Sequence, residues 1–73
     1  MRYIINLYTR DNLPKLIATL DVSAEFDVKT WIKANTDYQR KDVRVSSLYA
    51  YNEAFIRSER VYKQLNILNI KRV

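Results

Sequence analysis

The chain reads FDVKTWIKANTDY from Phe26 to Tyr38, and this stretch contains its only tryptophan, Trp31. Asp27 can act as a helix N-cap, because a short side-chain acceptor at that position meets the free backbone N–H groups of the first turn. Phe26 and Trp31 then occupy the two positions of a hydrophobic staple, one just before the cap and one four residues after it. The pattern therefore predicts a helix that starts after Asp27 and carries one apolar stripe.

The expected helix has two distinct sides, because its residue types recur at helical spacing. One side consists of Val28, Trp31, Ile32, Asn35 and Tyr38, and the other of Lys29, Lys33 and Asp37. Two boundaries stay open, since Ser23 is a second candidate for the N-cap and the helix ends at Asn35 or near Gln39. An apolar stripe must be covered, so we expect strands before and after the helix to form the surface beneath it.

Two segments before the helix have the composition of β-strands. Residues 2–9 are rich in β-branched and aromatic types, and residues 15–22 alternate between apolar and polar. The segment 10–14 between them contains Asp, Asn and Pro, which favour a turn, so the two strands are expected to form an antiparallel hairpin. In the second strand the side chains expected to point inward are Leu16, Ala18, Leu20 and Val22, and those expected to point outward are Ile17, Thr19 and Asp21.

A third strand is predicted over residues 43–51, with two alternatives for its faces. Strict alternation would place Val43, Val45, Ser47, Tyr49 and Tyr51 on one face. A bulge at Ser46-Ser47 would instead align Val43 and Val45 with Leu48 and Ala50, and would turn both tyrosines outward.

The last third of the chain is compatible with two structures. We favour a helix covering at least 59–65, supported by correctly oriented charge pairs between Glu and Arg or Lys four residues apart. The alternative is a strand from 55 to about 62, paired with the third strand. A closing strand is expected over 67–72. The predicted architecture is a single α+β domain, residues 1–73, built as a single-layer antiparallel sheet of three to four strands with one or two helices on one face, in the order β-β-α-β-(α or β)-β.

The composition excludes several classes of function. The 73 residues include no cysteine, no histidine and no glycine, so disulfides, thiolate or imidazole metal sites and glycine-rich phosphate loops are all excluded. Two acidic groups, around Asp37 and Asp42 and around Asp21 to Asp27, are better explained as solvated or capping residues than as catalytic or metal sites. We therefore expect no enzyme, no metal and no cofactor.

So short a chain has a small core, and the supplements that remain are a homodimer or docking on a larger partner. The start of the chain is interrupted by polar residues, unlike a signal peptide, and no apolar run approaches the ~20 residues of a membrane span. We expect a cytoplasmic protein without a membrane partner. The abundance of Ile, Asn, Lys and Tyr is typical of A+T-rich coding, as in the phages and mobile elements of low-G+C bacteria.

The positive charge is concentrated in the second half of the chain. Residues 1–38 contain five basic and five acidic side chains, whereas residues 39–73 contain eight basic and three acidic ones, which accounts for the whole net charge of +5. Four of the six tyrosines lie in or beside this basic half. Cations that meet phosphates and aromatic rings that stack on bases together indicate a surface for RNA or single-stranded DNA. The candidate binding residues are Arg40, Lys41, Arg44, Tyr49, Tyr51, Arg57, Arg60 and Lys63.

The function predicted from these features is that of a small, non-enzymatic binding protein whose partner is nucleic acid. The alternative is an accessory or inhibitory protein, of the phage or mobile-element type, that masks the surface of a larger protein. Exposed tyrosine and arginine are enriched at protein interfaces and fit this alternative as well. The two hypotheses differ in salt dependence, which is steep only for binding to phosphates.

Overall fold

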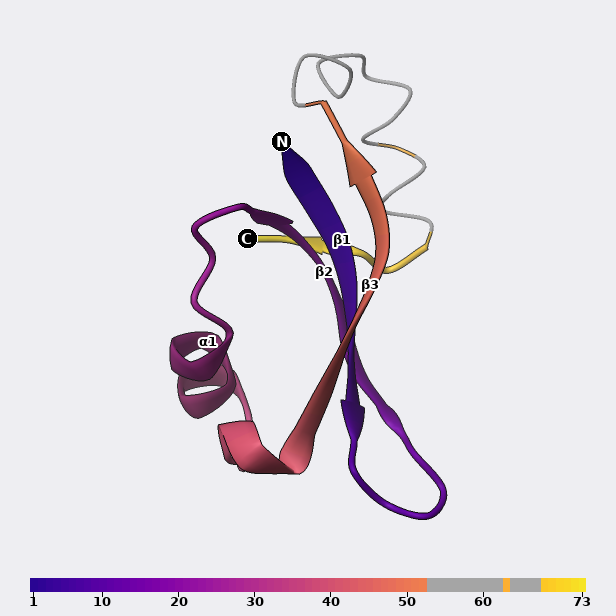
Figure 1. Cartoon of the computed structure of the whole chain (residues 1–73), viewed down its shortest axis with the longest axis vertical. Helices are drawn as coiled ribbons and strands as arrows, with labels where there is room; N and C mark the ends of the chain where they lie inside the picture. The colour runs from indigo at the N-terminus through magenta and orange to yellow at the C-terminus, as the bar shows by residue number, and fades with distance from the viewer. Residues whose placement is uncertain (53–62, 64–67) are drawn as a thin grey trace.

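The computed structural model of the chain describes residues 1–52, 63 and 68–73, and these residues form a four-stranded sheet with one α-helix beside it (Figure 1). The strands are β1 (Arg2–Thr9), β2 (Leu16–Ser23), β3 (Val43–Tyr51) and β4 (Lys71–Arg72). The helix is α1 (Val28–Asn35), and a 3₁₀ turn, η1 (Arg40–Asp42), leads into β3. The fold is broadly α+β, as the sequence predicts.

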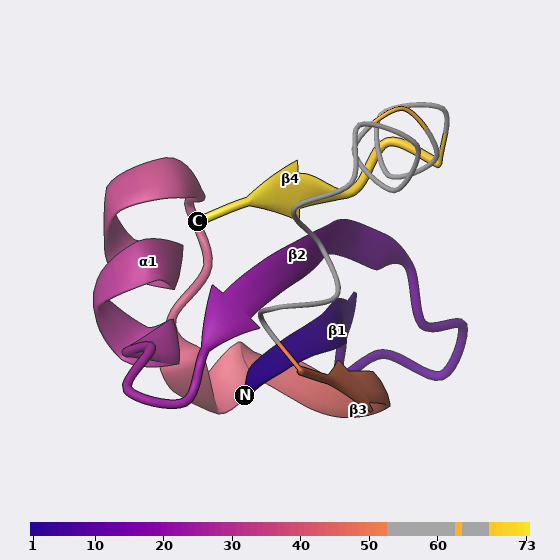
Figure 2. The same cartoon turned by 90° about the horizontal axis from the view of Figure 1, so that it is seen from above.

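The sheet is mixed, so the predicted antiparallel arrangement holds for β1, β2 and β3 but not for β4. Its strand order is β3-β1-β2-β4, with β1 antiparallel to both β2 and β3 and β4 parallel to β2 (Figure 2). The closing strand is also shorter than the expected 67–72, since β4 spans only Lys71–Arg72. Side-chain alternation is the same in parallel and antiparallel strands, so the sequence pattern carries no information about direction.

The start of α1 agrees with the predicted capping and staple. Asp27 is the N-cap, and its carboxylate accepts hydrogen bonds from the backbone N–H of Thr30 at 3.3 Å and from the Thr30 hydroxyl at 2.7 Å. Phe26 and Trp31 are both half-buried against the same core cluster. The helix ends at Asn35, the shorter of the two predicted lengths, because Thr36 leaves the helical conformation.

The core lies between α1 and one face of the sheet. Ile32 of α1 is fully buried there, and Leu7 of β1 and Leu20 of β2 are fully buried as well. The complete buried cluster is Ile5, Leu7, Leu20, Val22, Ile32 and Val43. Burial of each such side chain stabilises the fold by roughly 1.5–3 kcal/mol.

A bulge in β2 changes the face of one predicted core residue. Leu7 lies opposite Ala18, but the next residue of β1, Tyr8, lies opposite Leu16, so Ile17 is an extra residue in the ladder. Opposed residues share a face, and Leu16 is therefore on the opposite face from Ala18. The prediction that Leu16 points inward is wrong, and its side chain is 56% exposed.

A second bulge lies in β3, one residue later than the predicted position. Ile5 pairs with Ser47 and Ile4 pairs with Tyr49, which leaves Leu48 as the extra residue. The bulge places both tyrosines on the face opposite Val43 and Val45, as the bulged alternative predicts. Leu48 itself was expected on the core side with Ala50, but it is 56% exposed, because a bulged residue has no partner in the ladder.

The predictions for the last third of the chain are mostly outside the described residues. The helix over 59–65 and the alternative strand over 55–62 both fall there, apart from Lys63. Within the described residues, no helix is long and apolar enough to cross a membrane.

Candidate functional site

A cleft lined by cations lies between α1 and η1, and we refer to it as the cationic cleft. Its volume is about 510 Å³, within the range of roughly 300–1,000 Å³ that small-molecule sites occupy. Among the described residues, those that line it include no Asp or Glu. They are Lys29, Lys33, Tyr38, Gln39, Arg40 and Lys41.

One wall of the cationic cleft is a flank of α1. Lys29 and Lys33 are four residues apart, so they lie one above the other on the same side of the helix. Ile32, next to Lys33, is fully buried against the sheet, which fixes the rotation of the helix. Burial of the apolar stripe therefore determines that the two lysines face the connector to η1.

The other wall is formed by η1, which is fixed to the sheet at its end. The backbone N–H of Arg10, just after β1, donates to the carbonyl of Asp42 at 3.2 Å, and Val43, which follows, is fully buried. The Arg40 guanidinium donates through Nη1 to the carbonyl of Val43 at 2.8 Å. Arginine has five N–H donors, so this bond orients Arg40 and leaves donors for an anion.

The connector between the two walls turns at Thr36. Its backbone N–H and its hydroxyl both donate to the carbonyl of Ile32, at 2.9 and 2.8 Å. The hydroxyl oxygen in turn accepts from the backbone N–H of Tyr38 at 3.1 Å. These bonds reverse the chain direction after α1 and bring the Tyr38 ring, which is 43% exposed, to the rim of the cationic cleft.

The charges of the cationic cleft are only weakly compensated. Asp27 has a lowered pKa, mainly through its hydrogen bonds from Thr30 and to a smaller extent through the nearby charge of Lys29. Lys33, Arg40 and Lys41 have no salt bridge within the described part of the chain. Like charges around one cleft repel each other, and a bound anion relieves that repulsion.

The structure separates the predicted binding residues into different places. Arg40 and Lys41 lie in the cationic cleft, whereas Lys63 is exposed and does not line it.

Arg44 and Tyr49 are exposed on the outer face of the sheet, by which we mean the face opposite α1. They lie opposite Tyr8 and Ile4 of β1, four residues apart along that strand or about 13 Å, so they do not form one compact platform. Arg57 and Arg60 lie outside the described residues.

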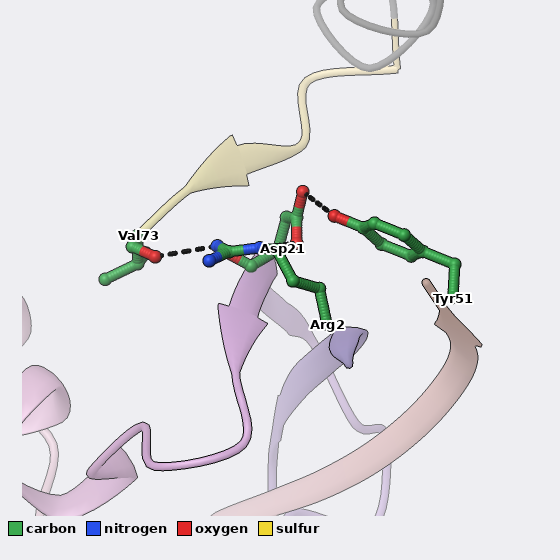
Figure 3. A network of polar contacts seen from close by, with 4 residues as sticks. All are labelled: Arg2, Asp21, Tyr51 and Val73. Carbon is green, nitrogen blue, oxygen red and sulfur yellow. Dashed lines mark hydrogen bonds and ion pairs between the residues drawn. The ribbon is translucent and has the colours of Figure 1, made fainter. Parts of the chain in front are cut away.

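Tyr51 lies on the outer face but is only 6% exposed, so the prediction that it is an exposed tyrosine is wrong. Its hydroxyl donates to the carboxylate of Asp21 (Figure 3). Its ring stacks against Tyr49, with the ring centroids 6.2 Å apart. Ile4 and Ile70 pack against it. Tyr51 therefore belongs to a second, smaller core on the outer face.

A buried ion pair completes this second core. Arg2 donates through Nε to Asp21 at 2.9 Å, and through Nη2 to the carbonyls of Asp21 at 2.7 Å and Val73 at 2.8 Å (Figure 3). Burial by itself lowers the pKa of Arg2, but the hydrogen bond and charge of Asp21 raise it above the ordinary value. Burial, followed by the hydrogen bond to Asp21, raises the pKa of Tyr51 to about 12. These groups link β1, β2, β3 and Val73 to one another on the outer face. None of them lines the cationic cleft.

Four residues of the cationic cleft were not predicted as binding residues from the sequence: Lys29, Lys33, Tyr38 and Gln39. The four-residue spacing of the two lysines was visible on the polar side of the predicted helix, but it is also typical of a solvated surface. The turn at Thr36 and the hydrogen bond that attaches η1 to the end of β1 bring these lysines close to Arg40 and Lys41. The attachment of η1 is a tertiary contact, which no local sequence pattern reveals.

No group of three acidic side chains in the described ranges is placed to hold a metal ion. No protein-family model matches the chain, and neither a curated protein nor a solved structure matches it. The function of the chain is therefore inferred from its own geometry and charge.

Proposed function

We propose that the protein binds single-stranded nucleic acid, with the phosphate backbone in the cationic cleft. The observation that carries this proposal is the gathering of four cations and one exposed tyrosine around a single cleft. Lys33, Arg40 and Lys41 would contact phosphate oxygens, with Lys29 beside them, and Tyr38 would stack on a base.

Three properties of the cationic cleft favour a phosphate ligand. Arg40 offers several N–H donors in one plane, an arrangement that suits phosphate oxygens. Lys29 and Lys33 supply mobile point charges on the opposite wall, so both walls can contact one phosphate backbone. Its lining includes no carboxylate among the described residues that would repel an anion.

The aromatic ring favours a single strand over a duplex. Tyr38 can stack only on a base whose face is accessible, and the faces of paired bases are covered by their neighbours. Stacking is tolerant of base identity, so we expect affinity without strong sequence preference.

The test is the salt dependence of binding to a labelled single-stranded oligouridylate, followed by fluorescence anisotropy between about 50 and 200 mM salt. If four phosphates are neutralised, the logarithm of the affinity should fall against the logarithm of salt with a slope of about −3. The double variant Lys33→Gln, Lys41→Gln removes one cation from each wall and should make the slope less negative by about 1.4.

The matched control is Lys15→Gln, Lys63→Gln, which removes the same charge from two lysines that do not line the cationic cleft. It should change the slope by less than half as much. Equal effects of the two double variants, or no binding at tens of micromolar protein, would contradict the proposal.

The second candidate is an accessory protein that docks on a larger protein through the edge strand β3. The bulge exposes Leu48 by 56% beside Tyr49, which is 59% exposed. Only one charged residue, Arg44, lies in this strand, and an edge strand can pair with a partner's strand. If the cationic cleft is the binding site, Tyr49→Glu should leave oligonucleotide binding unchanged in the same assay. If the edge of β3 is the binding site, Tyr49→Glu should instead weaken binding to a partner protein, and that binding should depend little on salt.

A further inference from the structure

A second hollow lies on the opposite flank of α1, between the helix and β4, and we refer to it as the Trp31 hollow. Its volume is about 510 Å³. In Figure 2 the end of β4 runs toward α1, and residues of both elements line the hollow. The residues that line it are Ile17, Ala18, Trp31, Asn35, Thr36, Lys71, Arg72 and Val73. None of the described residues that line it also lines the cationic cleft.

We propose that the Trp31 hollow binds a planar heteroaromatic ring that carries an anionic group, the chemical class represented by mononucleotides. The half-buried Trp31 and the apolar residues Ile17 and Ala18 would contact the ring. The exposed Lys71, on the opposite wall, would contact the anionic group. This site is independent of the cationic cleft, and the proposal does not rest on the proposed function.

The arrangement of Trp31 is suited to a ring ligand. Part of its indole packs against the main core cluster, and this packing together with the staple holds the side chain in place. The remainder lines the hollow, so a planar ligand gains stacking without first having to order a flexible side chain.

The polar lining supplies both a cation and an acceptor. The described lining residues include no Asp or Glu, whereas Lys71 and Arg72 both belong to them. The side-chain nitrogen of Asn35 donates to the carbonyl of Trp31 at 2.9 Å, which orients the amide. Its oxygen remains an acceptor for a ring N–H or an exocyclic amino group, the groups that a nucleobase presents.

The experiment is a titration of Trp31 fluorescence with adenosine monophosphate, excited at the red edge of indole absorption. Trp31 is the only tryptophan, so the signal reports this hollow alone. We expect saturable quenching below about 1 mM, the affinity range of a small open site. Adenosine should quench at higher concentrations than the nucleotide, and inorganic phosphate should not quench.

The discriminating variant is Lys71→Ala, with Lys15→Ala as the matched control. Lys71 is exposed, so its removal leaves the fold intact, and it should weaken nucleotide binding about three- to fivefold without changing the adenosine titration. The control should leave both titrations unchanged. Equal binding of the nucleotide by Lys71→Ala and by the unchanged chain would overturn the proposal.

Two further titrations distinguish the Trp31 hollow from the cationic cleft and a free nucleotide from a strand. The double variant Lys33→Gln, Lys41→Gln should show the same Trp31 quenching by the nucleotide as the unchanged chain, while its affinity for the oligonucleotide falls. Loss of both kinds of binding would place the nucleotide in the cationic cleft and overturn the proposal. A short oligoadenylate distinguishes the two sources of the ligand: quenching by the mononucleotide alone indicates a free nucleotide, and quenching by both indicates that a base within a strand also enters.

Discussion

At the residue scale, the most informative position is Asp21, which alternation alone would place among solvated residues. It is fully buried, because the outer face of the sheet is covered at this end by Arg2 and Tyr51. A buried carboxylate is stable only when it is paired and hydrogen-bonded, and both carboxylate oxygens of Asp21 have partners. Its environment therefore depends on two residues from other strands, which no local pattern reveals.

The raised pKa of Tyr51 predicts a loss of stability at high pH. The ordinary pKa of tyrosine is 10.0 and that of Tyr51 is about 12, so the folded state favours the protonated hydroxyl. The resulting stabilisation is complete below about pH 10 and disappears as the pH rises through about 12. We expect roughly 1–3 kcal/mol to be lost over this window.

The measurement is urea unfolding of the unchanged chain and of Tyr51→Phe at a series of pH values. Tyr51→Phe lacks the hydroxyl bond to Asp21 and should be less stable by about 1–2 kcal/mol near neutral pH. The difference between the two proteins should shrink between about pH 10 and 12, since only one of them ionises at this position. A difference that stays constant over that window would show that the hydroxyl does not titrate in this way.

At the scale of elements, the sequence predicts the parts that depend on local chemistry. The N-cap at Asp27 and the strand β1 (Arg2–Thr9) follow from residue types and spacing, and both are confirmed. The bulge at Leu48 was predicted only as an alternative and one residue too early, and the bulge at Ile17 was not predicted. An extra residue in a strand requires no particular side chain, so the sequence does not mark its position. The cationic cleft likewise depends on how η1 returns toward α1, which is a tertiary property.

The cap of α1 predicts a response at acidic pH. Hydrogen bonds from Thr30 lower the pKa of Asp27 below 3.8, so the ionised cap stabilises the helix above that value. The stabilisation is lost as the pH falls through the lowered pKa, that is, below about pH 4. Asp27→Ala should lower the thermal midpoint at neutral pH, and Asp27→Asn, which keeps an acceptor, should lower it less.

The control for this prediction is the pH profile of Asp27→Asn. Asparagine does not ionise, so the gap between its midpoint and that of the unchanged chain should close in acid, as followed by circular dichroism. A gap of the same size at neutral and acidic pH would mean that the charge of Asp27 does not contribute.

At the scale of the whole molecule, one side chain connects the first strand with the last described residue. Arg2 of β1 donates to the carbonyl of Val73 (Figure 3). The backbone N–H of Val73 donates to the carbonyl of Asp21 at 2.9 Å. β4 is only two residues long, so its position depends heavily on these bonds. Because residues of β4 also line the Trp31 hollow, the ion pair on the outer face helps to shape a hollow on the other side of the sheet.

This connection predicts that removal of Arg2 loosens β4. Arg2→Met alone leaves the Asp21 carboxylate buried without its cation and should cost about 3–5 kcal/mol, comparable to the whole stability of so small a domain. The double variant Arg2→Met, Asp21→Asn removes both charges and keeps an acceptor for Tyr51, so it should remain folded.

In that double variant the Val73 carbonyl still lacks its charged donor, a hydrogen bond of about 1.5–3 kcal/mol. Amide hydrogen exchange by NMR should therefore be about tenfold or more faster at Val73, while Leu7 in the central strand serves as the reference. Equal acceleration at both amides would indicate general destabilisation, and only a selective change at Val73 supports a latch between the two ends of the sheet.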